Sequence, residues 1–385
     1  MIRILIASSD TGGGHRSAAR ALQSAFSHQN SEQTPITVNT VQILEEGSVL
    51  TRQLANLYNW LLRHRQNWVK YYFQLLERLR PNESVRLFQH LRSYGEQLLA
   101  TYPPDVIVSV HPMLQHFFAD LLASQQREDI PLVTVVTDPA DGFWRGWACP
   151  TVKQYFVATE AAQQQLVEYG IPPEKIMVAG MPVHPHFHPV SPQEKQQLRV
   201  KYGLHPQRFT LLVNAGWIGG GNIPKIYQAL SQSENLEIQV VFLAGKNDKL
   251  AHHARQFAQT SHLPILVFDF VSSIHELMQL SDAMVSKLGG LTTFEALACE
   301  LPLIADTITP PMPQEAATVQ WLRAQDLAIF LKRPEEIVSA IALLANSSEK
   351  QQQLRQVSRL NLKPNSTAFI ASRILQLSQT VNKTT

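Results

Sequence analysis

The chain has 385 residues, of which 44% are hydrophobic and 17% are charged, and its formal net charge is +2. This length favours two domains of roughly 150–200 residues each. No apolar run approaches the ~20 residues that a membrane-spanning helix needs, and no secretory signal is recognisable. The two cysteines, Cys149 and Cys299, are too far apart to suggest a disulfide framework or a metal knuckle. A reducing cytoplasm is therefore the expected location.

A glycine-rich loop separates a strand-like run at residues 2–7 from a helix-like run at residues 17–26. Glycines let the backbone approach a ligand closely, and a helix that starts after them offers free N–H groups to a phosphate or an oxyanion. Its spacing is neither the dinucleotide fingerprint nor a Walker loop, so an ordinary first turn of an α/β domain is the alternative. The candidate residues in the loop are Asp10, Gly12, Gly13, Gly14 and His15.

Residues 50–95 form a local basic segment, with eight Lys or Arg against two acids. Between about residues 49 and 99 the apolar residues recur at helical spacing, and aromatic residues lie among the basic ones. This combination is typical of a helix that lies on an anionic membrane surface. The alternative is a helical excursion packed on its own domain, and no motif for reading nucleic acid is present. The residues predicted to contact the membrane are Trp60, Arg63, Arg65, Trp68, Lys70 and Tyr71.

Apolar runs that end in polar residues alternate with helix-like segments through the rest of the first half. The runs at 105–111 and 131–138 end at His111 and Asp138. This alternation predicts a parallel α/β sheet, and ligands bind beyond the carboxyl ends of such strands. His15, His111 and Asp138 are therefore expected at one edge of the sheet.

The proline-rich stretch 181–192 is interpreted as an interdomain linker, because four prolines in twelve residues cannot continue a helix or a central strand. Its three histidines have no carboxylate or cysteine nearby, so no metal site is expected. The predicted divisions are an N-terminal domain at 1–185, a C-terminal domain at 186–365, and a helix with a frayed tail at 366–385.

The second half repeats the alternation, with a second glycine loop after a strand at 208–214. A glycine turn near residue 289 then leads into a helix, with Thr292 and Thr293 as its possible caps and Glu295 in its first turns. A proline-rich segment at 309–315 follows the next strand. The two halves therefore share one architecture.

Several motifs resemble those of the monogalactosyldiacylglycerol synthase family, which is related to bacterial diacylglycerol glucosyltransferases and to the peptidoglycan enzyme MurG, of the glycosyltransferase family 28 type. They are Ser9–Arg16, Ser109–His116, Val135–Asp138, Gly180–Val183 and Ser286–Leu297. The segment after Asp138, the loop at 214–221 and the turn Gly-Gly-Leu-Thr at 289–292 depart from the plant pattern. The resemblance implies an α/β protein of GT-B fold, with two Rossmann-like domains facing each other across a cleft.

The resemblance also implies an inverting transfer of galactose or glucose from a UDP-sugar to diacylglycerol or a similar lipid, by a protein peripherally associated with an anionic membrane. His15 is the candidate base, because a helix N-terminus disfavours its charged form. Asp10 could orient that imidazole or take the proton itself, and His15 could instead bind phosphate. No cofactor or metal is expected, since the UDP-sugar is a co-substrate.

The predicted sites are an acceptor and phosphate loop and a donor site. Gly12, Gly13, Gly14, His111 and Asp138 make up the first. The residues predicted to bind the donor are Gly219, Gly220, Lys287, Gly289, Gly290, Thr292, Glu295, Gln314 and Glu315. Three alternatives remain open: a MurG-like UDP-GlcNAc transferase with another lipid-linked acceptor, a UDP-sugar epimerase, and a non-catalytic membrane-binding protein.

Overall fold

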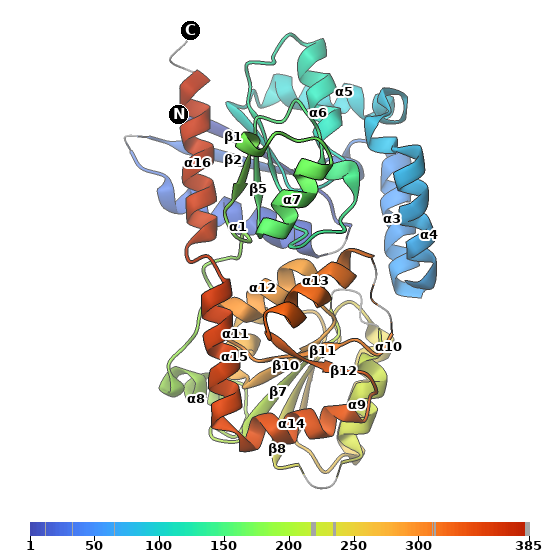
Figure 1. The fold of residues 1–385 in the computed structure, drawn as a ribbon, viewed down its shortest axis with the longest axis vertical. Helices are drawn as coiled ribbons and strands as arrows, with labels where there is room; N and C mark the ends of the chain where they lie inside the picture. Colours follow the sequence, from blue (N-terminus) through green and yellow to red (C-terminus); the bar gives the residue numbers. More distant parts are fainter. Residues whose placement is uncertain are drawn as a thin grey trace. The chain divides into compact units, whose positions relative to one another are not determined.

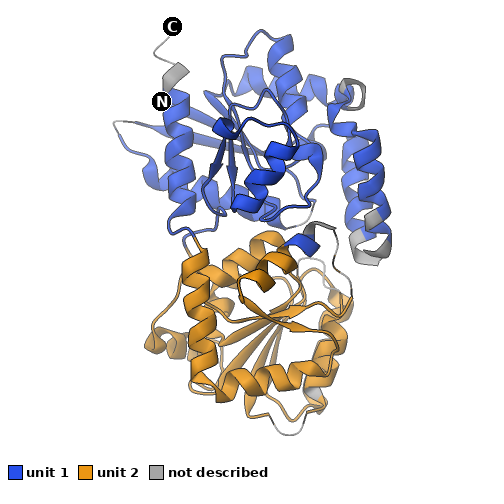
Figure 2. Ribbon diagram, in the orientation of Figure 1, with its two compact units in different colours: residues 1–185, 312–317, 363–385 blue, residues 186–311, 318–362 orange. Residues whose placement is uncertain are grey.

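A computed structural model describes residues 1–381 except 12, 33, 65, 217–220, 234–235, 310 and 312, and omits the side chains of 62–64, 66, 67, 70, 85–87, 231, 313, 314, 380 and 381. The chain forms two compact units (Figures 1 and 2). The first unit comprises residues 1–185, 312–317 and 363–385, and the second comprises 186–311 and 318–362.

The first unit is built on a parallel six-stranded sheet in the order β2-β1-β3-β4-β5-β6. Buried aliphatic residues fill both faces of the strands, as expected when helices cover the two sides of a parallel sheet. The strands are β1 (Ile2–Ser8), β2 (Ile36–Gln42), β3 (Val106–Ser109), β4 (Leu132–Val135), β5 (Gln154–Val157) and β6 (Ile176–Val178). The helices packed around them are α1 (Gly14–Gln29), α2 (Ile43–Glu46), α5 (Val85–Thr101), α6 (Gln115–Ser124), α7 (Glu160–Glu168) and α16 (Ser366–Val381).

A helical hairpin interrupts the alternation between β2 and β3. It consists of α3 (Val49–His64) and α4 (Gln66–Leu79), followed by a short 3-10 turn at Pro81–Glu83. Figure 1 shows the two helices side by side at the margin of the first unit. This is the basic, aromatic segment of the sequence, and it is helical as its apolar spacing predicts.

The second unit has a parallel sheet in the order β12-β11-β10-β7-β8-β9. Its strands are β7 (Phe209–Asn214), β8 (Ile238–Leu243), β9 (Ile265–Phe268), β10 (Ala283–Ser286), β11 (Leu303–Asp306) and β12 (Ala328–Leu331). Its helices are α8 (Pro192–Lys201), α9 (Ile223–Ser231), α10 (Asp248–Thr260), α11 (Ile274–Leu280), α12 (Gly290–Ala298), α14 (Glu336–Asn346) and α15 (Ser348–Asn361), together with α13 (Pro313–Ala324) from residue 318 onward. Two parallel sheets with flanking helices confirm the predicted α/β class.

The C-terminal helix α16 belongs to the first unit, which differs from the separate tail expected at 366–385. The Ser366 and Thr367 hydroxyls donate hydrogen bonds to the carbonyl oxygens of Met181 and Val183. The helix packs against α1, and its apolar face includes the fully buried Ile374. The stretch 312–317 also groups with the first unit rather than with the second. Among the described helices, none has the length and apolar character needed to cross a membrane.

Candidate active site

His15 lies in the first turn of α1, directly after the glycine loop, and its ring is held by two hydrogen bonds. Its Nδ1 lies 2.8 Å from the Val110 carbonyl oxygen and 3.0 Å from Thr137 Oγ1. Because a carbonyl can only accept, Nδ1 carries the proton, and Nε2 of the neutral ring keeps its lone pair. Burial lowers the pKa of His15 from 6.5 to about 4, against the opposing effect of the Val110 bond. The ring is therefore neutral at pH 7.

His111 follows β3 and makes an edge-on contact with His15, with 4.6 Å between ring centroids. Its Nε2 lies 2.7 Å from Thr11 Oγ1, and its Nδ1 accepts a hydrogen bond from the Met113 backbone N–H. Burial, followed by the proximity of His15, holds the pKa of His111 well below its usual value. Two neutral imidazoles therefore meet at this edge of the sheet.

Asp138 follows β4 and accepts a hydrogen bond of 2.7 Å from the indole N–H of the buried Trp147. Burial raises the pKa of Asp138, although the Trp147 bond acts in the opposite direction. His15, His111 and Asp138 line the same pocket, at the ends of three elements, as the argument from strand ends predicts.

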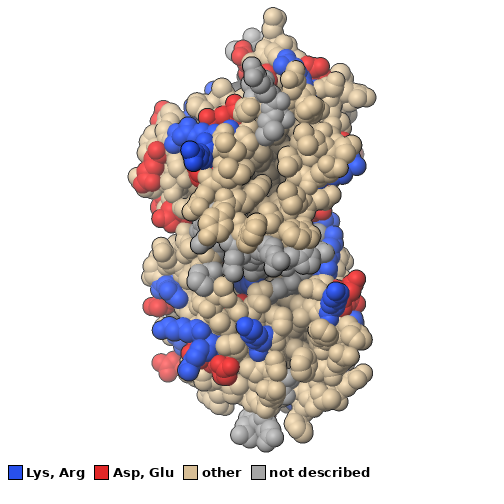
Figure 3. Space-filling view, turned by 90° about the vertical axis from the view of Figure 1, so that its right-hand side faces the viewer, with Lys and Arg blue, Asp and Glu red and all other residues tan. Residues whose placement is uncertain are grey.

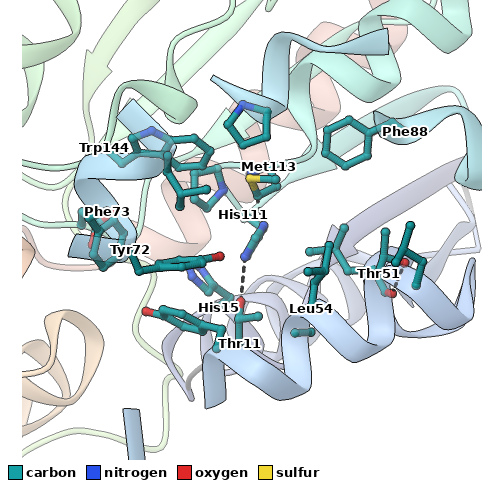
Figure 4. A pocket seen from close by; sticks show the side chains of 18 residues that line it. Thr11, His15, Thr51, Leu54, Tyr72, Phe73, Phe88, His111, Met113 and Trp144 are labelled. Atoms are coloured by element: carbon teal, nitrogen blue, oxygen red, sulfur yellow. Dashed lines mark hydrogen bonds between the residues drawn. The ribbon is translucent and has the colours of Figure 1, made fainter. Parts of the chain in front are cut away.

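This pocket lies within the first unit and has a volume of about 1190 Å³ when the space open to solvent is included. Thr11, His15 and His111 lie together, whereas α3 and α4 supply mainly apolar and aromatic walls, with Thr51 apart from the other polar groups (Figure 4). Figure 4 shows His111 joined to Thr11 by a hydrogen bond, with the His15 ring beside them. The apolar and aromatic lining residues are Leu44, Leu50, Leu54, Ala55, Tyr58, Tyr72, Phe73, Leu76, Phe88, Met113 and Trp144. An apolar cavity with a small polar end suits an apolar ligand that carries one reactive polar group.

Asp10 does not orient the His15 ring, which corrects one of the two roles considered for it. Its carboxylate forms an ion pair of 3.2 Å with Arg16, and its backbone oxygen accepts a hydrogen bond from Asn59 of α3. Val110 and Thr137 take the orienting role instead. Gly13 caps α1 and Gly14 begins it, while Gly12 lies outside the described residues.

In the second unit, the turn between β10 and α12 brings several of the predicted donor-binding residues together. Lys287 follows β10, Gly289 is the N-cap of α12, and Gly290 begins the helix. A Cβ at Gly289 would meet no atom within 4 Å, so the helix N-terminus is open to a ligand. The two threonines do not cap the helix as expected, because the Thr293 hydroxyl bonds back to the Gly289 carbonyl.

Glu295 lies in the second turn of α12 and is only 6% exposed. Burial raises the pKa of its carboxyl to about 7. Thr292 is half-buried on the same helix. Glu315, on α13, is also half-buried and falls in the stretch that groups with the first unit. Gly219, Gly220 and the Gln314 side chain lie outside the described residues.

An Asn222–Asp306 network holds the start of α9 in the second unit. Asp306 accepts hydrogen bonds from the Asn222 backbone and side-chain amides, each 3.0 Å long, and Asn222 also bonds Thr309. Gly221 precedes it with φ +71°, and a Cβ there would collide with the Lys287 side chain. Asp306 was not among the residues predicted from the sequence, although its position at the end of β11 is a signal that could have identified it.

Exposed apolar side chains are concentrated on the helical hairpin, and two of them, Leu50 and Leu54, also line the pocket. Nine of the fifteen exposed large hydrophobic residues of the described chain lie between residues 49 and 79, including Trp60 (49% exposed), Trp68 (63%) and Tyr71 (59%). The space-filling view of this side shows a broad uncharged surface in the first unit (Figure 3). Arg65 and the side chains of Arg63 and Lys70 lie outside the described residues.

Two parts of the chain match known family models. Residues 15–183 match the domain described as monogalactosyldiacylglycerol (MGDG) synthase, and residues 222–362 match the glycosyltransferase family 28 C-terminal domain. A probable chloroplastic monogalactosyldiacylglycerol synthase from Nicotiana tabacum is 30% identical over 88% of this chain and 64% of its own length. A processive diacylglycerol beta-glucosyltransferase from Bacillus pumilus is 26% identical over 100% of this chain and 97% of its own.

Solved structures share the fold at low sequence identity. UDP-GlcNAc 2-epimerase from Neisseria meningitidis superposes with a TM-score of 0.65 and 14% identity, covering 97% of this chain and 100% of the epimerase. MurG from Acinetobacter baumannii gives a TM-score of 0.59 and 13% identity, covering 98% of this chain and 99% of its own. These likenesses confirm the GT-B fold class. Through its two matched domains and its relatives, the chain is similar to monogalactosyldiacylglycerol synthases and diacylglycerol glucosyltransferases, which are glycosyltransferases.

Proposed function

We propose that this protein transfers a hexose from a UDP-sugar to the free hydroxyl of diacylglycerol at a membrane surface. The pocket of the first unit carries the proposal, since its apolar walls end at His15, His111 and Asp138. Diacylglycerol has two apolar chains and one free hydroxyl, which matches a mainly apolar cavity with one polar end. The family and its named relatives support the same reaction class.

His15 is the proposed general base. Its Nδ1–H is committed to the Val110 carbonyl, so Nε2 can accept the proton of the acceptor hydroxyl. The hydroxyl oxygen then bonds to the anomeric carbon, and the bond from that carbon to the UDP oxygen breaks with its electron pair leaving on UDP. Asp138, which lines the same pocket, is proposed to bind the acceptor hydroxyl. Its single described hydrogen bond uses only Oδ2.

The donor is proposed to bind the β10–α12 turn of the second unit. Lys287 and the free N–H groups at the start of α12 would contact the diphosphate. Glu295, buried on the same helix, would accept hydrogen bonds from the ribose hydroxyls, as the resemblance to the family implies. Glycines 219–220, Thr292, Gln314 and Glu315 remain predicted contacts of the donor.

The helical hairpin α3–α4 is proposed to dock on the membrane. It presents exposed aromatic and leucine side chains outward and lines the acceptor pocket with its inner side. An acceptor could then pass from the bilayer into the pocket without crossing water. Each basic residue near the surface would add roughly 1 kcal/mol to the free energy of binding to an anionic leaflet.

A product assay tests the reaction. Purified protein is incubated with diacylglycerol vesicles and either UDP-glucose or UDP-galactose, and the lipid product is identified by mass spectrometry. We expect a monohexosyl diacylglycerol and UDP release that requires the acceptor. Equal donor consumption without lipid would indicate an epimerase or hydrolase, and product only from a polyprenyl-linked acceptor would indicate a MurG-like transferase.

A vesicle-binding assay tests the membrane surface. Trp68→Ser should weaken binding to anionic vesicles about tenfold, because one large apolar side chain no longer enters the interface. Phe369→Ser, at a 45% exposed aromatic residue of α16, is the matched control and should bind as the unaltered protein does. Binding should fall with added salt, and equal binding to neutral and anionic vesicles would contradict the electrostatic part of the proposal.

A further inference from the structure

Glu45 is an acidic residue beside the glycine loop that lines no part of the acceptor pocket. It lies on α2, and its Oε1 accepts hydrogen bonds from the Ser9 hydroxyl (2.7 Å) and from the Asp10 backbone N–H (2.8 Å). Its Oε2 is buried and has no hydrogen-bond partner among the described residues. Burial raises the pKa of Glu45, while the bonds from Ser9 and Asp10 lower it. The Glu45 carboxylate is therefore partly desolvated, and its hydrogen bonds to Ser9 and Asp10 offset part of that cost.

The bonds at Glu45 continue as a directed chain to the polar end of the pocket. An ionised carboxylate only accepts, so Ser9 donates to Glu45, and Ser9 Oγ is then free to accept from Thr11 Oγ1 at 3.2 Å. His111 Nδ1 accepts from the Met113 N–H, so the His111 proton is on Nε2 and points to Thr11 Oγ1. Every donor in the chain is thus oriented toward Glu45.

A second set of contacts ties the same loop to the helix that lines the acceptor pocket. Arg52 Nε of α3 donates to the Glu45 carbonyl oxygen at 2.6 Å, and Asn59 Nδ2 of α3 donates to the Asp10 carbonyl oxygen at 3.1 Å. Glu45 therefore stands between the loop that carries His15 and the wall of the cavity that would hold the lipid.

We propose that Glu45 is a positioning residue for the transfer reaction, which rests on the function proposed above. Its carboxylate fixes the backbone at Asp10 and, through Ser9 and Thr11, the orientation of His111. His111 in turn contacts the edge of the His15 ring, whose Nε2 must face the acceptor hydroxyl. Glu45 itself touches neither substrate and exchanges no proton with the acceptor.

Three variants test this role, with activity on diacylglycerol and affinity for UDP as the readouts. Glu45→Ala removes both bonds and should lower kcat about 10- to 100-fold, the effect of losing hydrogen bonds to a charged group. Glu45→Gln keeps an oxygen that can accept both bonds and should recover most of that loss. Glu46→Ala is the matched control, because Glu46 also accepts two hydrogen bonds, from Gln42 and Tyr94. The kcat of this variant should stay within about threefold of that of the unaltered protein. UDP affinity should not change in any of them.

Hydrogen–deuterium exchange gives a readout that does not depend on turnover. The segment at residues 8–16 should exchange faster in Glu45→Ala than in Glu46→Ala or the unaltered protein, because the Asp10 N–H loses its acceptor. If Glu45→Ala does not fold, Ser9→Ala breaks the chain at its first link and should still lower kcat.

Activity and exchange in Glu45→Ala equal to those in Glu46→Ala would overturn the proposal, as would unchanged kcat in Ser9→Ala. A Glu45→Gln variant as inactive as Glu45→Ala would also overturn it, since the charge would then matter rather than the position. If the unaltered protein forms no glycolipid, the proposed function fails instead, while the exchange result still decides whether Glu45 holds the loop.

Discussion

The unusual acidity of the His15 imidazolium leads to a sharp prediction about how catalysis depends on pH. With a pKa of about 4, roughly 97% of His15 is neutral at pH 5.5, whereas an ordinary imidazole with a pKa of 6.5 would be about 9% neutral. The catalytic contribution of His15 should therefore be almost the same at pH 7.5 and pH 5.5. An unburied histidine base would lose about tenfold over that interval.

His15→Gln isolates this contribution from those of Asp138 and Glu45, whose pKa values burial raises and which stay in place in the variant. General-base catalysis is usually worth about 10²–10⁴-fold, and a base with a pKa of about 4 lies at the weak end of that range. We therefore expect the ratio of kcat/KM between the unaltered protein and the variant to be about 10² at both pH values.

The assay measures kcat/KM for diacylglycerol at pH 7.5 and pH 5.5 for both proteins, with UDP affinity as the control for the integrity of the donor site. Since kcat/KM reports the ionisation of the free enzyme, the relevant pKa of His15 is that of the ligand-free protein. A ratio near one would exclude His15 as the base. A ratio that falls about tenfold between the two pH values would refute the inference that burial keeps the imidazole neutral.

Three further outcomes follow from the two sites. Ala55→Phe, at a buried position of the pocket wall, should raise KM for diacylglycerol about tenfold and leave UDP affinity unchanged. UDP-glucose affinity, measured by calorimetry, should increase up to about tenfold from pH 6 to pH 8. The Glu295 carboxyl has a pKa of about 7 and must ionise to accept hydrogen bonds from both ribose hydroxyls. The Glu295→Gln variant should show no such increase. Gly221→Ala should lower the free energy of unfolding by about 1–3 kcal/mol, because φ is +71°, and should also weaken UDP-glucose binding, because the new Cβ meets the Lys287 side chain. Gly216→Ala, with φ +77° and no atom near the new Cβ, should lower stability through backbone strain alone.

The strand alternation was predictable because each buried run ends in polar residues, and the same logic places His15, His111 and Asp138 at one pocket. Their roles stay predictions. The orienting partner of His15 was not predictable, because the Val110 carbonyl is a backbone group that every residue possesses. Glu45 follows a strand in a four-residue helix and belongs to no motif, so only the folded structure brings it to the loop.

The position of the last helix also escaped the sequence analysis, since an apolar helical face does not reveal which sheet it will cover. Ile370 and Ile374 of α16 are fully buried in the cluster that contains Ile4 of β1 and Phe26 of α1. Pattern alone therefore predicts the existence of such helices well, whereas their tertiary partners depend on contacts between distant parts of the chain.

That placement has a consequence for biosynthesis. β1 and α1 are translated before α16, so the apolar surface around Ile4 and Phe26 stays uncovered by α16 while more than 300 intervening residues are translated. The first unit therefore cannot reach its native state until α16 has been made, whereas all residues of the second unit are already present by residue 362. A nascent chain at this stage exposes apolar surface, and it should depend on chaperones until α16 has emerged and packed.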